Sequence, residues 1–349
     1  MMSIRKSSIT ALAILSLCLT GALTAPQAGF AKVKKEALEK RRRFNSLVTE
    51  GMAHFNRKDF SGAIPKFKEA TELEPLDASV QYYLGLTCVH AGDFKQAEDA
   101  LIKVVLVSNE SSTFKKNALK CFDSYRKEFS HVRPYCCLNI NGKFFHWTEK
   151  SMPVKVYISD GLELPRAYQG ERLKPDRIVE LAKLLRNRNI AATLFKQKHY
   201  QDGFNVSVRK GLDEWAWADT EGILKYKLVK DPAQANILVY WCSKFKGPEL
   251  ASTIYSAGPG EPIFIQIAVD TLLQQPLQKW QAIVQAVGAH EFGHAFGLQN
   301  SDSPIDIMYP VERLKYSHTG HKQVLPNSVT NSDSAVLRAL YSLPAPILK

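Results

Sequence analysis

The sequence predicts an α+β protein in which a block of paired helices precedes a mixed sheet with helices of its own. Three observations carry this prediction: a repeat with a period of 34 residues, several strand-like apolar runs after residue 150, and a long helix near 277–298. The chain has 349 residues, of which 45% are hydrophobic and 23% charged. A chain of this length and composition buries a full core and is long enough for two domains.

The first thirty residues have the order of a secretory signal peptide. Arg5 and Lys6 precede an apolar run over 9–19, and small residues follow, among them Ala25 and Ala31. The run is too short for a membrane-spanning helix, which needs roughly twenty residues. We therefore expect residues 1–31 to be a signal peptide cleaved after Ala25 or Ala31, with an uncleaved membrane anchor as the alternative. Cleavage would leave a protein without a membrane span, secreted or held in the cell envelope or periplasm.

Neither the charge nor the cysteines indicate a further function. The net charge is +12, but Lys and Arg are spread along the chain and no fingerprint of a nucleic-acid module occurs, so nucleic acid is not an expected partner. Without Cys18 the cysteines are odd in number and form no CxxC pair. This pattern predicts neither a zinc ribbon nor a complete disulfide framework, and it leaves one bridge through Cys136 or Cys137 open.

The repeat occupies residues 44–128. Three features recur after 34 residues: Gly51 as Gly85, Asp59-Phe60 as Asp93-Phe94, and Ala63 as Ala97. This period resembles the tetratricopeptide repeat, in which small residues let paired helices approach closely. Residues 112–128 resemble a half-length capping helix, because their apolar residues recur at helical spacing. The resemblance implies either a groove for a protein partner or a spacer packed on the neighbouring domain.

Residues 150–345 have the pattern of a mixed α/β domain. Apolar runs predict four strands, at 152–159, 223–229, 237–241 and 263–269. Helical periodicity predicts three helices, at 175–188, from about 202 to 215, and at 277–298. This order places a twisted sheet against two helices. The last helix carries the candidate catalytic and metal-binding residues.

That helix contains the sequence His290-Glu291-Phe292-Gly293-His294. Residues i and i+4 lie one turn apart on one helix face, so both imidazoles can bind one zinc ion. Glu291 then lies beside the metal, where a carboxylate takes a proton from zinc-bound water. The five-residue motif alone is a weak signal, because it also occurs by chance.

The longer stretch HEFGHAFGLQNSDSPIDIMYP, from His290 to Pro310, resembles the metzincin zinc metalloproteases, and most closely their matrixin-like branch. Gly297 lies where that family leaves the helix to bring in a third metal ligand, and Met308 lies where it has its Met-turn. Residues 331–341 resemble the family's C-terminal helix. The resemblance covers about residues 150–345 and implies a zincin domain with a mixed sheet, an active-site helix and a Met-turn beneath the metal.

The third ligand position departs from the family pattern. It holds Asn300, where the family has His or, less often, Asp. A neutral amide oxygen is a weaker zinc donor than imidazole or carboxylate. We take His290, His294 and Asn300 as the candidate zinc ligands. Asp302 is the nearest substitute for Asn300, and His318 and His321 would have to reach back from beyond the Met-turn.

The sequence thus predicts a secreted zinc endopeptidase in which Glu291 activates a zinc-bound water and a peptide or protein is the substrate. The resemblance implies that the substrate lies along an edge strand of the sheet, near 263–269. The alternative is a catalytically degenerate, metzincin-like scaffold whose repeats bind a protein partner. The two hypotheses share one fold and differ in metal content.

Overall fold

The computed structural model describes residues 25–140, 143–169, 175–187, 193–247, 249–255, 261–274, 279–310, 326 and 328–344. The chain forms two compact units, one ending at Ser46 and one beginning at Leu47, and helix α1 (Ala25–Asn56) contributes residues to both. No described helix is both long enough and apolar enough to cross a membrane. Most of the expected signal peptide lies outside the described residues, so its cleavage stays a prediction.

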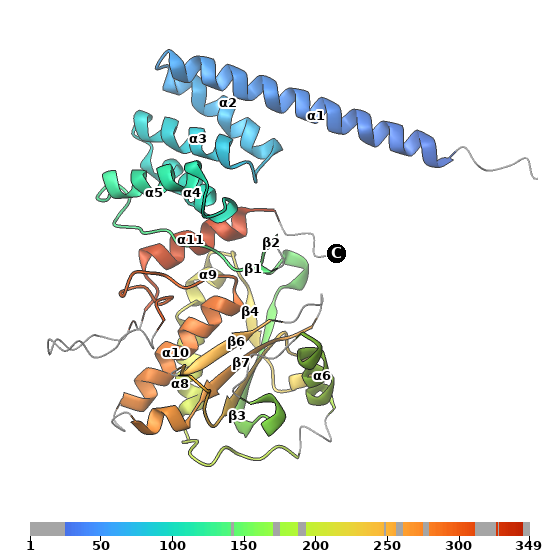
Figure 1. Cartoon of the computed structure of the whole chain (residues 1–349), viewed down its shortest axis with the longest axis vertical. Helices are drawn as coiled ribbons and strands as arrows, with labels where there is room; N and C mark the ends of the chain where they lie inside the picture. The colour runs from blue at the N-terminus through green and yellow to red at the C-terminus, as the bar shows by residue number, and fades with distance from the viewer. Residues whose placement is uncertain are drawn as a thin grey trace, which may run out of the picture. The chain divides into compact units, whose positions relative to one another are not determined.

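Paired helices begin the second unit. They comprise the end of α1, followed by α2 (Phe60–Leu73), α3 (Ala78–Ala91), α4 (Phe94–Val107) and α5 (Thr113–Ser124). The side chains of Asp59, Asp77 and Asp93 accept backbone N–H bonds at the first turns of α2, α3 and α4. Such caps satisfy donors that have no partner within the helix, so each aspartate fixes where its helix begins. In Figure 1 these helices are stacked above the sheet.

One helix–helix contact occurs twice at the predicted 34-residue spacing. A Cβ on Gly51 would come within 2.7 Å of the Phe67 ring, and a Cβ on Gly85 within 2.6 Å of the Leu101 side chain. Phe67 and Leu101 lie 34 positions apart and are both completely buried. Each pair of helices therefore meets at a glycine. The helical block is confirmed, while its assignment as tetratricopeptide repeats stays a prediction.

A mixed sheet of five strands follows, which confirms the α+β class. Its spatial order is β4-β3-β5-β7-β6. The strands are β3 (Val154–Glu163), β4 (Tyr226–Leu228), β5 (Ile237–Cys242), β6 (Ala251–Ile254) and β7 (Ile263–Ala268). All neighbours are parallel except β6, which runs antiparallel to β7. A separate two-stranded ribbon pairs β1 (Asn139–Ile140) with β2 (Lys143–Phe144).

The predicted position of the edge strand is wrong. Residues 263–268 form β7, which lies between β5 and β6, and all six are buried, as in a strand covered on both faces. The edge next to β7 is β6, which the sequence reading missed. In its sequence ASTI only Ile254 is a large apolar residue, so the segment shows neither a clear alternation nor an apolar run.

Helices cover both faces of the sheet (Figure 1). On one face α6 (Pro175–Arg186) packs Ile178, Leu181 and Leu185 in one core cluster with β5 and β7. On the other face α8 (Phe204–Asp213) packs against α10 (Trp280–Ala295). The sequence predicted that the first of these two helices extends to about 215, but α8 ends at Asp213, and Trp215 directly precedes α9 (Ala216–Thr220). The predicted long helix ends at Ala295 rather than 298.

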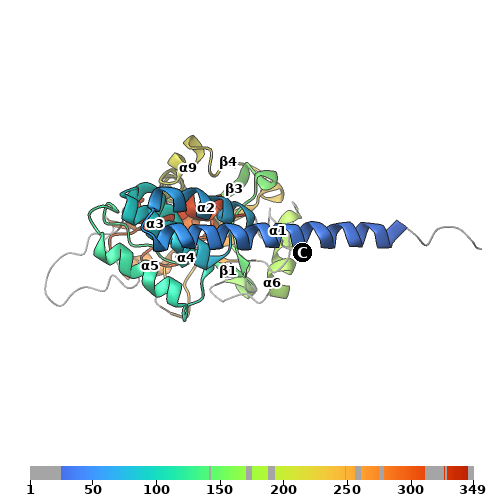
Figure 2. The same ribbon diagram turned by 90° about the horizontal axis from the view of Figure 1, so that it is seen from above.

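The last helix joins the helical block to the sheet domain. α11 (Asn331–Ser342) packs against α4. Figure 1 shows α11 next to the helices of the helical block, and in the view from above in Figure 2 helices α2, α3 and α4 lie in front of the sheet domain. The chain that leaves the helical block is also bonded to α11: the Arg133 N–H donates to Ser332 Oγ at 3.0 Å. The Tyr135 hydroxyl donates to Asp333 Oδ1 at 2.7 Å. The two parts of the second unit are therefore in direct contact.

Replacing Gly85 by Val tests the helix–helix contact. The added methyl groups would overlap Leu101, so we expect the free energy of unfolding to fall by about 1–3 kcal/mol, as is usual for overpacking. Urea unfolding followed by circular dichroism measures the change, with Ala91→Val at the exposed end of α3 as control. Equal stability of the two variants would contradict the close approach of α3 and α4.

Candidate metal centre

Helix α10 carries two of the three candidate ligands, His290 and His294, on its most buried part. Every residue from Ala286 to Ala295 is buried except His294. Two indoles from distant segments hold this part in place: Trp215 Nε1 donates to the Ala289 carbonyl, and Trp147 Nε1 donates to the Ala295 carbonyl, each at 2.9 Å. The second bond satisfies a carbonyl at the helix end that has no partner within the helix. The helix is thus fixed along the segment that bears the histidines.

The structure brings His290 and His294 together. Their ring centroids lie 4.6 Å apart, with an angle of 89° between the planes. His290 Nδ1 lies 3.0 Å from the Ile307 carbonyl oxygen, and His294 Nδ1 lies 2.8 Å from that of Leu298. A carbonyl oxygen only accepts, so each Nδ1 carries the proton and each Nε2 keeps its lone pair. This is the tautomer that a metal-binding histidine requires.

The same environment keeps both imidazoles uncharged. Burial, together with the smaller effect of the neighbouring His294, lowers the pKa of His290 to about 3. Burial also lowers the pKa of His294. The carbonyls of Ile307 and Leu298 and the side chain of Asn300 oppose these shifts without reversing them. Both rings are therefore neutral at physiological pH, as metal binding demands.

Asn300 lies beside both histidines. Its side chain is within hydrogen-bonding reach of each imidazole and raises both pKa values, as an accepting amide oxygen does. Within the described ranges no three His, Cys, Asp or Glu side chains are grouped closely enough to hold a metal ion, so Asp302 does not join the two histidines in such a group. His318 and His321, the more distant alternatives, lie outside the described residues.

Gly297 turns the chain from the helix toward Asn300. Its φ is +104°, and a Cβ at this position would overlap the Phe145 carbonyl oxygen. Only glycine adopts this backbone conformation without strain and also admits so close a neighbour. The Leu138 N–H donates to the Gly297 carbonyl at 2.7 Å, which fixes the turn from the other side. The chain thus leaves the helix at Gly297, as the resemblance to the metzincins implied.

Met308 lies under the histidine-bearing part of α10. The side chain is fully buried, and a Cβ on Gly293 would overlap its Sδ. The Ser301 N–H donates to the Met308 carbonyl at 2.8 Å, so the loop after Asn300 pairs with the methionine turn. Since the next carbonyl upstream, that of Ile307, bonds His290, this turn helps to set the orientation of the imidazole.

Buried carboxyl groups hold the methionine turn. Asp306 accepts from Ser301 Oγ at 2.6 Å and from Thr330 Oγ1 at 2.8 Å. Asp333, at the first turn of α11, accepts from the Ile307 N–H at 3.0 Å. Burial raises the pKa of Asp306 to about 6, and the negative charge of Asp333 adds to the rise. Sequence reasoning missed this network, because its members are far apart along the chain.

Glu291 is held from the sheet. The Thr253 hydroxyl lies 2.5 Å from Glu291 Oε2 and 3.1 Å from the Glu291 carbonyl oxygen. Tyr255, two residues further along the chain, is close enough for the Glu291 charge to raise its pKa, although burial is the larger cause. Sequence reasoning missed Thr253 together with β6. A weak signal was present, because Thr and Ile in ASTI favour a strand.

The chemistry of this donor set fits a zinc ion. Two neutral imidazoles with Nε2 lone pairs and an amide oxygen beside both provide three donors, and a catalytic zinc site uses three protein ligands and leaves one position for water or substrate. The amide is the weakest donor of the three. The buried carboxylate of Glu291 follows His290 directly in the helix, as a general base beside such a metal requires.

Comparison with known proteins agrees with this geometry. Residues 193–342 match the Matrixin peptidase family model. This range contains the histidines, Glu291, Asn300, Met308 and most of the sheet. No curated protein sequence matches the chain significantly. The similarity to the matrixin family therefore extends over residues 193–342.

The raised pKa of Asp306 predicts a pH dependence of stability. An unfolded aspartate titrates near 3.8 and the folded one near 6, so between these values the unfolded state loses its proton first. This group therefore stabilises the fold at pH 4, and that contribution is lost as the pH rises to 6. Asp306→Asn keeps a neutral, accepting side chain and should gain about 2 kcal/mol relative to wild type between pH 4 and pH 7.

Urea unfolding at a series of pH values measures this gain. Asp213→Asn, at an exposed position on α8, is the control and should follow wild type at every pH. A constant difference between Asp306→Asn and wild type from pH 4 to pH 7 would show that Asp306 titrates normally.

Proposed function

We propose that the chain is a zinc endopeptidase with His290, His294 and Asn300 as metal ligands and Glu291 as general base. One observation carries the proposal: two neutral imidazoles, one buried and one half-buried, lie one helical turn apart, each with Nδ1 bonded to a carbonyl and with the Asn300 amide beside both. The similarity to the matrixin family over 193–342 supports the same reaction class. Hydrolysis of a peptide bond is the chemistry that this arrangement serves.

The residues divide the work of hydrolysis. His290, His294 and Asn300 would hold the zinc ion, which would supply polarisation of the scissile carbonyl and a lowered pKa of the attacking water. Glu291 takes a proton from the attacking water and passes it to the departing amine. Thr253 donates to one carboxylate oxygen of Glu291 and so helps to orient the carboxylate. A carboxylate that is already oriented loses less conformational entropy when it reaches its reactive position.

The edge strand β6 is the proposed binding place for an extended peptide. In the described sheet β6 pairs with β7 on one side only, so its outer edge offers backbone donors and acceptors. A peptide that pairs there adds a strand to the sheet. Thr253 belongs to β6 and contacts Glu291, so the edge leads directly to the general base. This corrects the expected position at 263–269.

Export and partner binding belong to the same proposal. An N-terminal signal of the kind expected over 1–31 would deliver the enzyme to the cell envelope or beyond, and the helical block would dock a protein partner or substrate. The competing hypothesis is a scaffold without activity. The observation that favours it is Asn300 at the third ligand position, because its amide oxygen is a weak zinc donor. Zinc content separates the two.

Replacing Glu291 by Gln tests the general base. We expect the zinc to stay bound, because the ligands are unchanged, while hydrolysis of a quenched-fluorescent peptide library falls by about two powers of ten or more. Glu128→Gln, at an exposed position of the helical block, is the control and should retain full activity. Undiminished hydrolysis by Glu291→Gln would remove Glu291 from the mechanism.

Replacing Asn300 by His tests the third ligand. The imidazole would replace a weak oxygen donor, so we expect a higher zinc affinity and, where metal occupancy limits the enzyme, a higher activity. Competition against a chromogenic chelator measures the affinity, and Asp302→Ala is the matched variant two residues away. An unchanged affinity in Asn300→His, together with loss of zinc in Asp302→Ala, would assign the ligand to Asp302. Absence of zinc from all variants would favour the scaffold.

A further inference from the structure

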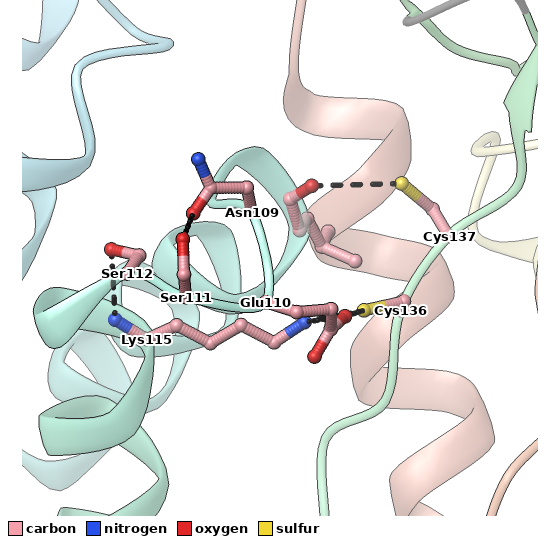
Figure 3. Close-up of polar contacts among 8 residues, drawn as sticks. Asn109, Glu110, Ser111, Ser112, Lys115, Cys136 and Cys137 are labelled. Carbon is pink, nitrogen blue, oxygen red and sulfur yellow. Dashed lines mark hydrogen bonds and ion pairs between the residues drawn. The ribbon is translucent and has the colours of Figure 1, made fainter.

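A lysine, a cysteine and a glutamate meet where the helical block joins the sheet domain (Figure 3). Lys115 lies on α5 and is 5% exposed. Its Nζ is 2.8 Å from Cys136 Sγ and 2.5 Å from Glu110 Oε1, and Sγ is 3.4 Å from the same carboxylate oxygen. The three side chains belong to different segments, since Glu110 lies between α4 and α5 and Cys136 lies after α5. None of them takes part in the proposed hydrolysis.

The cluster is accessible to small molecules. It lines a cavity of about 330 Å³, whose wall also includes Arg133 and Asp302. Cys136 itself is half-buried, whereas the adjacent Cys137 is buried and its Sγ turns to the Leu106 carbonyl, 3.9 Å away. Figure 3 shows the two sulfur atoms directed to different partners. Of these two adjacent thiols, Cys136 is therefore the one that a dissolved oxidant reaches.

We propose that Cys136 and Lys115 form an oxidation site at which hydrogen peroxide joins Sγ and Nζ through one oxygen atom. The two atoms lie closer than a nitrogen and a sulfur in ordinary non-bonded contact, and their separation suits one intervening oxygen. A half-buried thiol held against a buried amine directs oxidation to a cross-link, because the amine is in place when the sulfur is oxidised. Glu110 lies against both groups and accepts the proton that is released.

The reaction consumes two equivalents of peroxide. In the first step Sγ attacks one peroxide oxygen, the O–O bond breaks, and the thiol becomes a sulfenic acid while one water leaves. In the second step an N–O bond forms between Nζ and the sulfenic oxygen while one N–H bond and the sulfenic O–H bond break. The second peroxide takes up these two hydrogens, its O–O bond breaks, and two waters leave. The lysine nitrogen begins as an ammonium group, and its remaining surplus proton passes to the Glu110 carboxylate. The product links Lys115 and Cys136 as Nζ–O–Sγ.

The link would join the helical block to the segment at Cys136, which pairs with the loop that carries Asn300. The Gln299 N–H donates to the Cys136 carbonyl at 3.1 Å, and Cys137 pairs with Leu298 in an isolated antiparallel β-bridge of the backbone. Position 299 directly precedes Asn300. A covalent bond from α5 to Cys136 would therefore fix the segment that pairs with this loop, whether or not the loop binds zinc.

Peptide mass mapping of the full-length chain tests the proposal. Reduced protein is titrated with hydrogen peroxide, digested and analysed with and without reducing agent. We expect a joined peptide pair containing Lys115 and Cys136, heavier than the two peptides by one oxygen and lighter by two hydrogens, that separates on reduction. Lys116→Arg, which alters the exposed neighbour on α5, should keep the pair. Lys115→Arg and Cys136→Ser should abolish it.

Three results would overturn the proposal. The first is oxidation of Cys136 to sulfenic or sulfinic acid without a joined pair. The second is a joined pair that lacks the additional oxygen, which indicates a direct sulfur–nitrogen bond. The third is a pair that forms equally in Lys115→Arg, with circular dichroism showing that the variant is folded.

Discussion

The hydrogen bonds from the two histidines to backbone carbonyls are the constraint on which the site depends. Each Nδ1 is bonded to a carbonyl of the loop that follows α10, one at Leu298 and one at Ile307. The imidazoles are oriented only if that loop leaves the helix at Gly297 and returns under it at Met308. The tautomer, the neutral state and the place of Asn300 all follow from this one loop path.

The loop is in turn held by parts of the chain far away in sequence. Asp333 of α11 bonds both the Ile307 N–H and the Tyr135 hydroxyl, and Asp306 bonds Thr330. Residues 136–138 pair with 297–299. α11 also packs on α4. The helical block therefore supports, through α11, the loop that follows α10 and carries Asn300. A partner bound to the helices would act on elements that touch the site.

The parts of the site that were predictable are those set by local geometry. His290, Glu291 and His294 follow from the spacing on a helix, whereas Gly297 and Met308 were implied by the resemblance to the family pattern. The edge strand was misplaced because strand order depends on pairing between distant segments, which no local pattern in β6 or β7 reveals. Thr253 was missed for the same reason: its contact with Glu291 exists only because β6 pairs antiparallel with β7.

Zinc K-edge X-ray absorption spectroscopy of the zinc-loaded, full-length chain tests the central claim most directly. The spectrum reports the identity and the distance of the atoms bound to the metal. We expect one zinc per chain with two imidazole nitrogens and oxygen donors at about 2.0–2.2 Å. Failure to retain zinc would contradict the metal centre, and a shell of three imidazoles would contradict Asn300 as the third ligand.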